Sequence, residues 1–146
     1  MEINGGNNWP TYLYRWTLAD TRFGRIYLHH FVRSDWAPDL HDHPKRFWSI
    51  GLRGSYREEY FDRSARVLRS RRYRAPWVRT FPAEHSHRLI LAPGETAWTV
   101  VLVGNPRRPW GFWVRGTWVH WREYVQTAGG ATGRARSSDS LAGGGR

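Results

Sequence analysis

The sequence predicts an all-β protein, a single barrel or double-stranded jelly roll with little helix. Short segments rich in β-branched and aromatic residues recur along the chain, and turns that contain Gly or Pro separate them. No long stretch repeats its apolar residues about every 3.6 positions, as an amphipathic helix would. Roughly eight to ten short strands with this punctuation are typical of barrels and jelly rolls, in which antiparallel sheets enclose one core.

Each expected strand lies between turn residues. In chain order, the expected strands are 12–16, 25–33, 46–52, 55–61, one or two strands within 66–80, then 96–103, 110–114 and 117–125. Residues 46–52 alternate, so that Trp48 and Ile50 share one face. A turn at 53–54 ends this strand, and Ala75-Pro76 divides 66–80. Residues 96–103 are β-branched and aromatic, and therefore form the clearest core strand.

The chain divides into three parts. Residues 1–8 are expected to be a disordered leader, because they contain Asn and Gly and little to bury. Residues 9–126 form the β-barrel, which is long enough for one sizeable core. Residues 127–146 consist largely of Gly, Ala, Ser and Arg and are expected to be a flexible tail.

Composition excludes several classes of protein. The chain has no cysteine, so disulfides, Cys-ligated zinc, Fe–S clusters and thiol nucleophiles are excluded. No run of ~18 apolar residues occurs, as a membrane span would require. The first residues also lack the basic and apolar regions of a signal peptide. We therefore expect a soluble, cytoplasmic protein with no membrane partner.

The net charge of +11 leaves nucleic acid open as a partner. However, Lys45 is the single lysine among 23 basic residues, and so lopsided a ratio is as typical of GC-rich codon usage as of phosphate binding. The arginines are spread along the expected strands, apart from a cluster within 66–74. A small-molecule substrate is therefore favoured over a nucleic acid.

The segment His41-Asp42-His43 carries the strongest chemical signal. Side chains two residues apart in an extended segment point the same way, so both imidazoles face one side. A third imidazole from a neighbouring strand would complete a three-nitrogen face with open positions, as catalytic metals keep. Residues 82–87 supply histidines for this purpose. The alternative is that these histidines lie on the surface or make structural hydrogen bonds.

The order of these motifs resembles that of the cupin superfamily of small β-barrel proteins, over residues 25–125. The usual first cupin motif has His-x-His, then a glutamate four or five positions on, then a glycine. His41 and His43 match the histidines, and Gly54 matches the glycine. Phe47 or Trp48 stands at the glutamate position, so the acidic ligand is missing.

The second cupin motif, Pro-x-Gly-x-x-His, is similar to the segment that begins at Pro82 and ends at His87. Glu84 replaces its glycine. Segments 41–44, 54–59 and 110–113 also resemble a group of small uncharacterised cupin-like proteins from bacteria and phages. The resemblance implies a metal held by His41, His43 and His87, with His85 or Glu84 as a further candidate ligand.

The resemblance also implies a range of activities. Three-histidine iron sites occur in cupins such as the thiol dioxygenases, so Fe(II) and a dioxygenase-like oxidation of a small molecule are the first expectation. Zn, Ni or Mn with a non-redox isomerase or epimerase is the second. A barrel that only binds a small ligand or a polyanion is the third. Cupins often pair through an edge strand or their outer sheet, so a homodimer that uses Trp9, Tyr12 and Tyr14 is expected.

Further site candidates lie near the predicted ligands. They are Glu59 and Tyr56 for catalysis, and Arg46, Arg53, Arg88 and Trp48 for substrate binding. Burial would raise the pKa of an inward glutamate towards neutrality, so that it could accept a proton. An inward arginine could bind a substrate carboxylate or phosphate through two parallel hydrogen bonds. The alternative is that the charged residues pair on an exposed surface. Asp42 is expected to be solvated or to cap a loop.

Overall fold

The computed structural model describes residues 1–3 and 10–127, and within them the chain forms eleven strands. In chain order the strands are β1 (Glu2–Ile3), β2 (Leu13–Thr21), β3 (Gly24–Phe31), β4 (Leu40–His41), β5 (Phe47–Asp62), β6 (Val67–Arg74), β7 (Trp77–Phe81), β8 (His87–Ile90), β9 (Ala97–Val103), β10 (Gly111–Val114) and β11 (Thr117–His120). Residues 121–127 are helical. No helix in the described part of the chain is long and apolar enough to cross a membrane.

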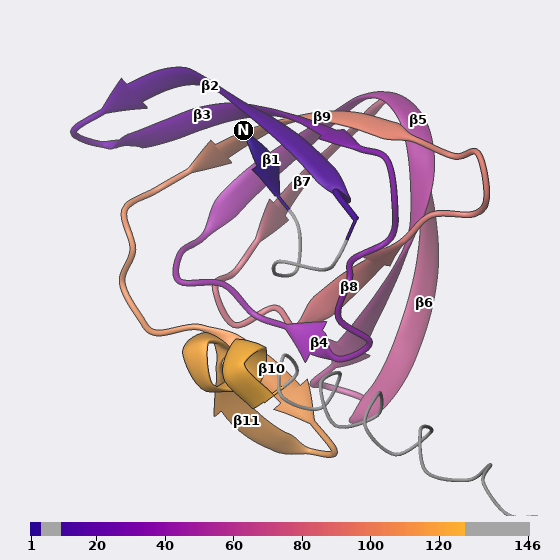
Figure 1. The fold of residues 1–146 in the computed structure, drawn as a ribbon, viewed down its shortest axis with the longest axis vertical. Coiled ribbons are helices and arrows are strands. Elements are labelled where there is room, and N and C mark those ends of the chain that lie inside the picture. The colour runs from indigo at the N-terminus through magenta and orange to yellow at the C-terminus, as the bar shows by residue number, and fades with distance from the viewer. Residues whose placement is uncertain (4–9, 128–146) are drawn as a thin grey trace, which may run out of the picture.

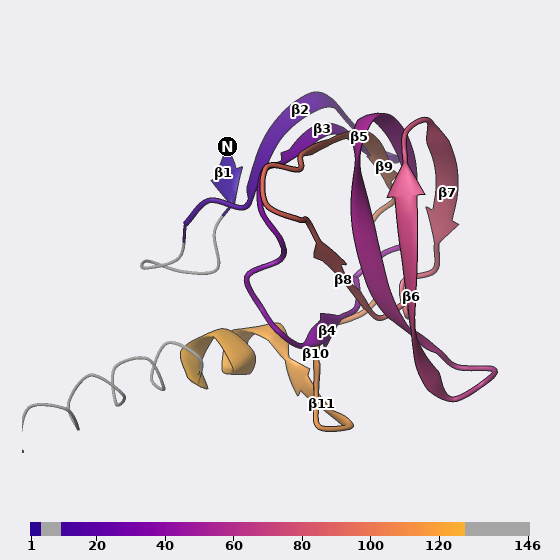
Figure 2. The ribbon, with the colours of Figure 1, turned by 90° about the vertical axis from the view of Figure 1, so that its right-hand side faces the viewer.

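The strands form two antiparallel halves that share β5. Residues 47–54 of β5 pair with β9 and β7, and β3, β2 and β1 continue this half. Residues 55–62 of β5 pair with β6 and β8, and β4, β10 and β11 continue the other half. Figures 1 and 2 show the two halves curving around a common interior. The all-β, double-stranded jelly-roll prediction is confirmed.

One long strand replaces the two strands predicted over 46–61. Residues 53–54, expected as a turn, lie inside β5, where the pairing with β9 shifts register between Gly51 and Arg53. Gly54 takes a positive φ of 84° there, and a Cβ at this position would collide with the backbone carbonyl of Thr96. The glycine therefore allows a β-bulge that carries the strand from one half of the barrel to the other.

The end of the predicted strand 117–125 was wrong. The strand β11 stops at His120, and residues 121–127 form a helix instead. Trp121 and Tyr124 lie three residues apart and so face the same side of this helix. Tyr124 stacks on Phe112 with ring centroids 3.9 Å apart, and Trp121 stacks on Trp110 at 5.7 Å. These contacts close one end of the barrel.

The structure also bears on the predictions for residues 66–80 and for the leader. Residues 66–80 do form two strands, β6 and β7, and the cis peptide Ala75–Pro76 lies between them. Residues 2–3, expected in a disordered leader, form β1 and pair with Leu13 and Tyr14 of β2. The remainder of the predicted leader, residues 4–8, and residues 128–146 of the predicted tail lie outside the described residues.

The interior side chains come from alternate positions of the strands. In β9, Ala97, Thr99 and Val101 are buried, while the intervening side chains face outward. The main core cluster lines the inside of the barrel and consists of Leu13, Phe31, Tyr56, Leu89, Leu91 and Ala97. A second cluster, centred on Ala37, Phe112 and Tyr124, joins helix 121–127 to β10.

The outer side of β2, β3, β9, β5 and β7 is also apolar. This outer apolar face consists of Tyr14, Trp16, Ile26, Leu28, His30, Trp48, Ile50, Val78, Trp98, Val100 and Leu102. Several of its members are well exposed, including Trp48 at 50% and Val78 at 65%. His30 stacks on Trp98 at 4.0 Å, and Trp16 stacks on Trp98 at 5.8 Å. Such a broad exposed apolar surface is typical of an interaction site.

Candidate metal centre

Two neighbouring strands and one loop bring three histidines together. His41 ends β4 and pairs with His87 at the start of β8, so their backbones lie side by side. His43 follows in the loop after β4, where its backbone N–H donates to the carbonyl of Ala83 over 2.9 Å. Because positions 41 and 43 are two residues apart in an extended segment, both imidazoles face His87.

The imidazole nitrogens of His41, His43 and His87 converge. One ring nitrogen from each lies within 4.8 Å of the others, and the Nε2 atoms of His43 and His87 are 2.9 Å apart. Burial lowers the pKa of His41 to about 3, and the charges of His87 and His85 add to this effect. Burial, followed by the charge of His87, likewise lowers the pKa of His43 well below its ordinary value. Both rings are therefore neutral at pH 7, which is the form that binds metals.

Glu58 orients His87 by contacting Nδ1, the ring nitrogen that does not meet His43. This fully buried carboxylate on β5 lies 2.7 Å from His87 Nδ1 and 2.8 Å from His85 Nε2, and it accepts a 2.7 Å bond from Arg79. Burial alone would raise the pKa of Glu58, but the hydrogen bonds from His85 and His87 and the charges of His87 and Arg79 outweigh it and hold the pKa well below its ordinary value. A carboxylate on Nδ1 leaves Nε2 of His87 free as a ligand.

A second carboxylate, Asp35, lies beside His41. Its Oδ2 atom is 3.8 Å from His41 Nδ1 and accepts a 2.7 Å hydrogen bond from the backbone of Leu89. Burial raises the pKa of Asp35 to about 6, against the lowering effects of the Leu89 hydrogen bond and of the charges of His87 and Arg88. Asp35 therefore borders the histidine cluster at His41, whereas Glu58 contacts it at His87.

Asp42 supports the site from the outside of the cluster. Its side chain is fully buried, where it accepts from the Gly111 backbone at 2.8 Å and from Trp118 Nε1 at 3.1 Å. It also pairs with Arg108 at 3.0 Å. Arg108 in turn donates to the backbone carbonyl of His43. The expectation of a solvated Asp42 was wrong, since the carboxylate is a buried link between β4, β10 and the His43 loop.

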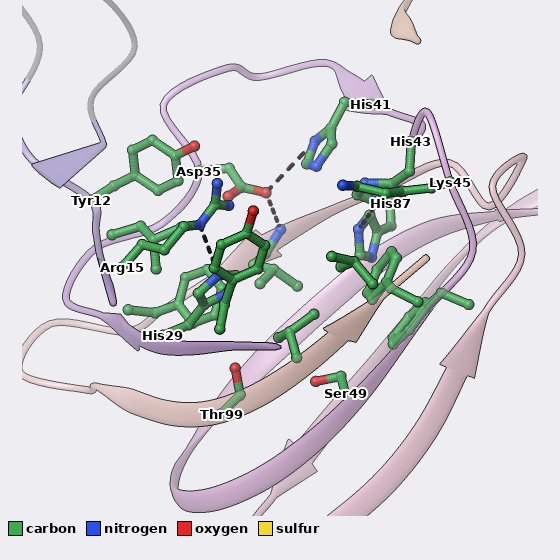
Figure 3. A pocket seen from close by; sticks show the side chains of 18 of the residues that line it. Tyr12, Arg15, His29, Asp35, His41, His43, Lys45, Ser49, His87 and Thr99 are labelled. Atoms are coloured by element: carbon green, nitrogen blue, oxygen red, sulfur yellow. Dashed lines mark hydrogen bonds and ion pairs between the residues drawn. The ribbon is translucent and has the colours of Figure 1, made fainter. Parts of the chain in front are cut away.

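A cavity of about 360 Å³ opens beside the histidines, inside the barrel. Figure 3 shows His41, His43 and His87 at one side of it and Arg15, His29 and Tyr12 at the other. Much of its wall is apolar, including Phe31, Phe47, Phe81, Leu89, Val101 and Val103. A cavity of this size and lining suits a small, largely apolar molecule.

Several of the predicted site residues lie away from this cavity. Glu59 pairs with Arg57 at 3.0 Å and with Arg88, and neither it nor Arg88 lines the cavity. Arg46 and Arg53 are exposed, and Trp48 belongs to the outer apolar face.

Other predicted residues lie at or near the site. Tyr56 is buried and lines the cavity. His85 contacts Glu58 and belongs, with Glu58 and His87, to a second group of converging ligand atoms. Glu84 is exposed and belongs to neither group. Of the aromatics predicted to pair two copies, Tyr12 lines the cavity, Tyr14 lies on the outer apolar face, and Trp9 lies outside the described residues.

Sequence reasoning chose Glu59 over Glu58 and gave His29 a structural role, and it named neither Asp35 nor Arg15 as a site residue. One signal was present for Glu58, because residues 56 and 58 of a strand share a face whereas 56 and 59 do not. Tyr56 and Glu59 were therefore incompatible as partners in one strand. Nothing comparable pointed to Asp35 or Arg15, which reach the cavity from segments distant in sequence.

Comparison with known proteins shows the fold. No protein-family model matches the chain, and no curated protein matches its sequence. The polyketide cyclase RemF from Streptomyces resistomycificus superposes with a TM-score of 0.60 over 79% of this chain and 79% of that one, at 17% identity. An uncharacterised conserved protein with a double-stranded β-helix domain from Klebsiella pneumoniae gives 0.52 over 68% and 83%, at 12% identity.

A third similar structure contains iron. Fe(II)-HppE, solved with the alternative substrate (S)-1-HPP, superposes with a TM-score of 0.55 over 70% of this chain and 55% of that one, at 10% identity. At such identities the likeness concerns the fold. The described residues thus have a cupin-like, double-stranded β-helix fold, as the His-x-His and Pro-x-x-x-x-His segments predicted, with a group of three histidines that could hold a metal ion.

Proposed function

We propose that the protein is a metal-dependent cupin enzyme that carries out a dioxygenase-like oxidation of a small molecule. His41, His43 and His87 would hold one divalent metal ion at the wall of the cavity. The observation that carries this proposal is the convergence of the three ring nitrogens beside a largely apolar cavity, with the pair of Nε2 atoms only 2.9 Å apart. Fe(II) is the proposed metal, and Zn, Ni or Mn would suit the same nitrogen ligands.

The surrounding residues support metal binding by these histidines. Glu58 contacts Nδ1 of His87 and so directs Nε2 toward the other two rings, as carboxylates behind metal-bound histidines do. Neutral His41 and His43 need lose no proton before binding. A bound metal would supply a Lewis acid or redox centre with open positions for substrate. The apolar wall around it would exclude bulk water and hold the body of the substrate.

A non-redox reaction is the second candidate function. Asp35 lines the cavity beside His41 and is the carboxyl group placed to exchange a proton with a bound substrate. An isomerase or epimerase of a small molecule would use this carboxyl with a metal that does not change its oxidation state. Metal identity separates the two candidates, because the oxidation requires iron and the isomerisation tolerates zinc.

The direct test is the metal content of protein purified without a metal-binding tag. We expect near-stoichiometric iron in the wild type and loss of this iron in both His87→Ala and His43→Ala. Two variants are used because His87→Ala also removes a partner of Glu58, whereas His43 makes no such contact. His120→Ala, which changes a histidine of β11 outside the cluster, is the control and should keep its metal.

The possible results lead to different conclusions. Stoichiometric zinc or nickel that both variants lose would retain the site and favour the non-redox reaction. A folded wild type that takes up no metal, even after reconstitution under anaerobic conditions, would refute the metal-dependent function. The protein would then be a barrel that binds its ligand without a metal.

We also propose that the outer apolar face pairs two copies of the chain. Among the described outward-facing residues of β2, β3, β7, β9 and residues 47–54 of β5, only Arg53 carries a formal charge, and it lies at the margin of the face. Two copies of a chain with a net charge of +11 repel each other at most surfaces, so a face with a single charge at its margin is where they could meet. A second copy supplies a matching apolar face by symmetry. Residues 4–9 and 128–146 contain too few apolar side chains to cover it themselves.

Light scattering after size-exclusion chromatography checks this pairing. We expect the wild type to have twice the chain mass of 17.2 kDa, and Trp48→Glu and Val78→Glu to have the mass of one chain. A buried glutamate without a partner would oppose association. Leu68→Glu, at an exposed leucine of β6 outside this face, should leave the mass unchanged. A monomeric wild type would refute the proposal.

A further inference from the structure

Arg15 is a cation inside the cavity with no acidic partner among the described residues. Its Nε donates to His29 Nε2 over 2.9 Å, and its guanidinium lies over the ring of Tyr27 at 4.8 Å. Among the residues that the structure describes, no carboxylate lies within ion-pair distance of Arg15, and no hydrogen bond uses its two terminal nitrogens. Burial lowers the pKa of Arg15, which indicates that its charge is costly where it stands.

The surroundings of Arg15 fix its position without neutralising it. His29 is almost fully buried, and burial followed by the charge of Arg15 lowers its pKa to about 3, so the ring is neutral and accepts the Arg15 hydrogen bond. The edge of the guanidinium that carries the two terminal nitrogens is therefore left for another partner. A carboxylate matches this edge, since two parallel N–H···O bonds can form.

Two further features of the cavity point to a polar ligand. Lys45 lines it on the same side as His43, and no carboxylate among the described residues lies within ion-pair distance of it either (Figure 3). Thr99 Oγ1 is buried in the wall without a hydrogen-bond partner. Buried hydroxyls are normally hydrogen-bonded, so this group is available to a second polar atom of a ligand.

We infer that Arg15 is the anion-binding residue of the cavity, that Lys45 adds to its positive potential, and that the substrate is a small carboxylic acid with an apolar body. The identity of the bound acid as a substrate rests on the proposed function. The anion subsite itself needs no metal. A single guanidinium edge matches the two oxygens of a carboxylate monoanion. A phosphoryl group, with three oxygens and a larger charge, would need more donors than this cavity offers at Arg15.

Binding to metal-free protein tests the inference separately from the metal site. The probes are benzoate, phenylacetate and hexanoate, each paired with its neutral amide, and phenylphosphonate. Dissociation constants are measured by calorimetry after chelator treatment, in the wild type and in Arg15→Gln, Lys45→Gln and His87→Ala. The control variant is Arg71→Gln, which changes an exposed arginine of β6 that does not line the cavity.

We expect the wild type to bind at least one acid about 10- to 100-fold more tightly than its amide, as a charge-assisted pair of hydrogen bonds provides. Arg15→Gln should remove this preference, Lys45→Gln should reduce it, and Arg71→Gln should leave it unchanged. His87→Ala should keep it, since Arg15 does not depend on the metal ligands. Lys45 makes no hydrogen bond or ion pair with the described residues, so Lys45→Gln remains informative even where Arg15→Gln fails to fold.

Three results would overturn the anion subsite at Arg15. In the first, no acid binds the wild type more tightly than its amide. In the second, a folded Arg15→Gln keeps the full preference for the acid over its amide. If Arg15→Gln does not fold, the same result in Lys45→Gln counts instead. In the third, acids bind only after metal is added, which would place the carboxylate on the metal instead of on Arg15. Tighter binding of phenylphosphonate than of benzoate would overturn the assignment to carboxylic acids. Absence of metal from the wild type would refute the proposed function and leave the anion subsite intact.

Discussion

Glu58→Gln is expected to weaken metal binding by about 10- to 100-fold, the usual effect of removing a carboxylate behind a metal-bound histidine. The Glu58 carboxylate contacts His87, His85 and Arg79 at once. A glutamine retains one acceptor oxygen. Its NH₂ group would replace the other oxygen with a donor, which would face the donors of His85, His87 or Arg79 and repel them. The His87 ring would then lose the hydrogen bond that holds Nε2 toward His43.

The same change is expected to lower the free energy of unfolding by about 3–5 kcal/mol, because it leaves a charged partner inside the protein. The Arg79 guanidinium lies over the rings of Tyr73 and Phe81 at 3.8 and 4.3 Å and has Glu58 as its ion-pair partner. Urea denaturation measures this loss, and competition with a chromophoric chelator measures the metal affinity.

The neighbouring residue offers the matched control. Glu59→Gln changes the same side chain one position along β5, where it meets Arg57 and Arg88 in a partly exposed setting. We expect its metal affinity to equal that of the wild type, and its stability to change by no more than about 1 kcal/mol. Equal effects of Glu58→Gln and Glu59→Gln on metal affinity would contradict the positioning role of Glu58.

The second large effect is expected at Asp42, which links three segments of the barrel. Asp42→Ala should lower the free energy of unfolding by about 3–5 kcal/mol, since it removes the ion-pair partner of Arg108 and leaves Trp118 Nε1 and the Gly111 N–H without their acceptor. Because Arg108 also donates to the backbone carbonyls of His43 and Ala83, the loss should loosen the loop that places His43. Metal affinity is therefore expected to fall together with stability.

Urea denaturation followed by tryptophan fluorescence measures the effect of Asp42→Ala. Asp20→Asn is the control, because Asp20 forms an exposed ion pair with Arg25 at the far end of β2. The control should unfold close to the wild-type midpoint. An Asp42→Ala protein that unfolds at the wild-type midpoint would show that Asp42 does not hold β10 and the His43 loop to β4.

Much of the fold follows from local patterns in the sequence. The alternation of apolar residues located most strands, because a strand buries every second side chain whatever it pairs with. The failures came where tertiary contacts decided the structure. Residues 121–125 have the aromatic composition of a strand, yet they form a helix whose Trp121 and Tyr124 stack on Trp110 and Phe112. Their partner rings lie in a different segment, so the composition of 121–125 alone could not indicate the helix.

The choice between Glu58 and Glu59 has a precise structural cause. Phe47, Ser49 and Gly51 face the interior, and uninterrupted alternation from them would turn Glu59 inward. The register shift between Gly51 and Arg53 adds one residue to β5 and reverses the alternation, so that Tyr56 and Glu58 face inward instead. A bulge of this kind is a response to pairing with β9 and is not visible in the strand's own residues.

By itself, the sequence determined the all-β class, most strand positions and the common direction of His41 and His43, since these depend on the two-residue period of an extended chain. The tertiary structure alone decided which groups surround the histidines. Glu58 reaches His87 because β5 and β8 pair, and Asp35 reaches His41 because its loop lies against β8. Arg15 faces the same cavity because the two halves of the barrel enclose one interior. Such contacts arise from the pairing of distant segments, which no local spacing encodes.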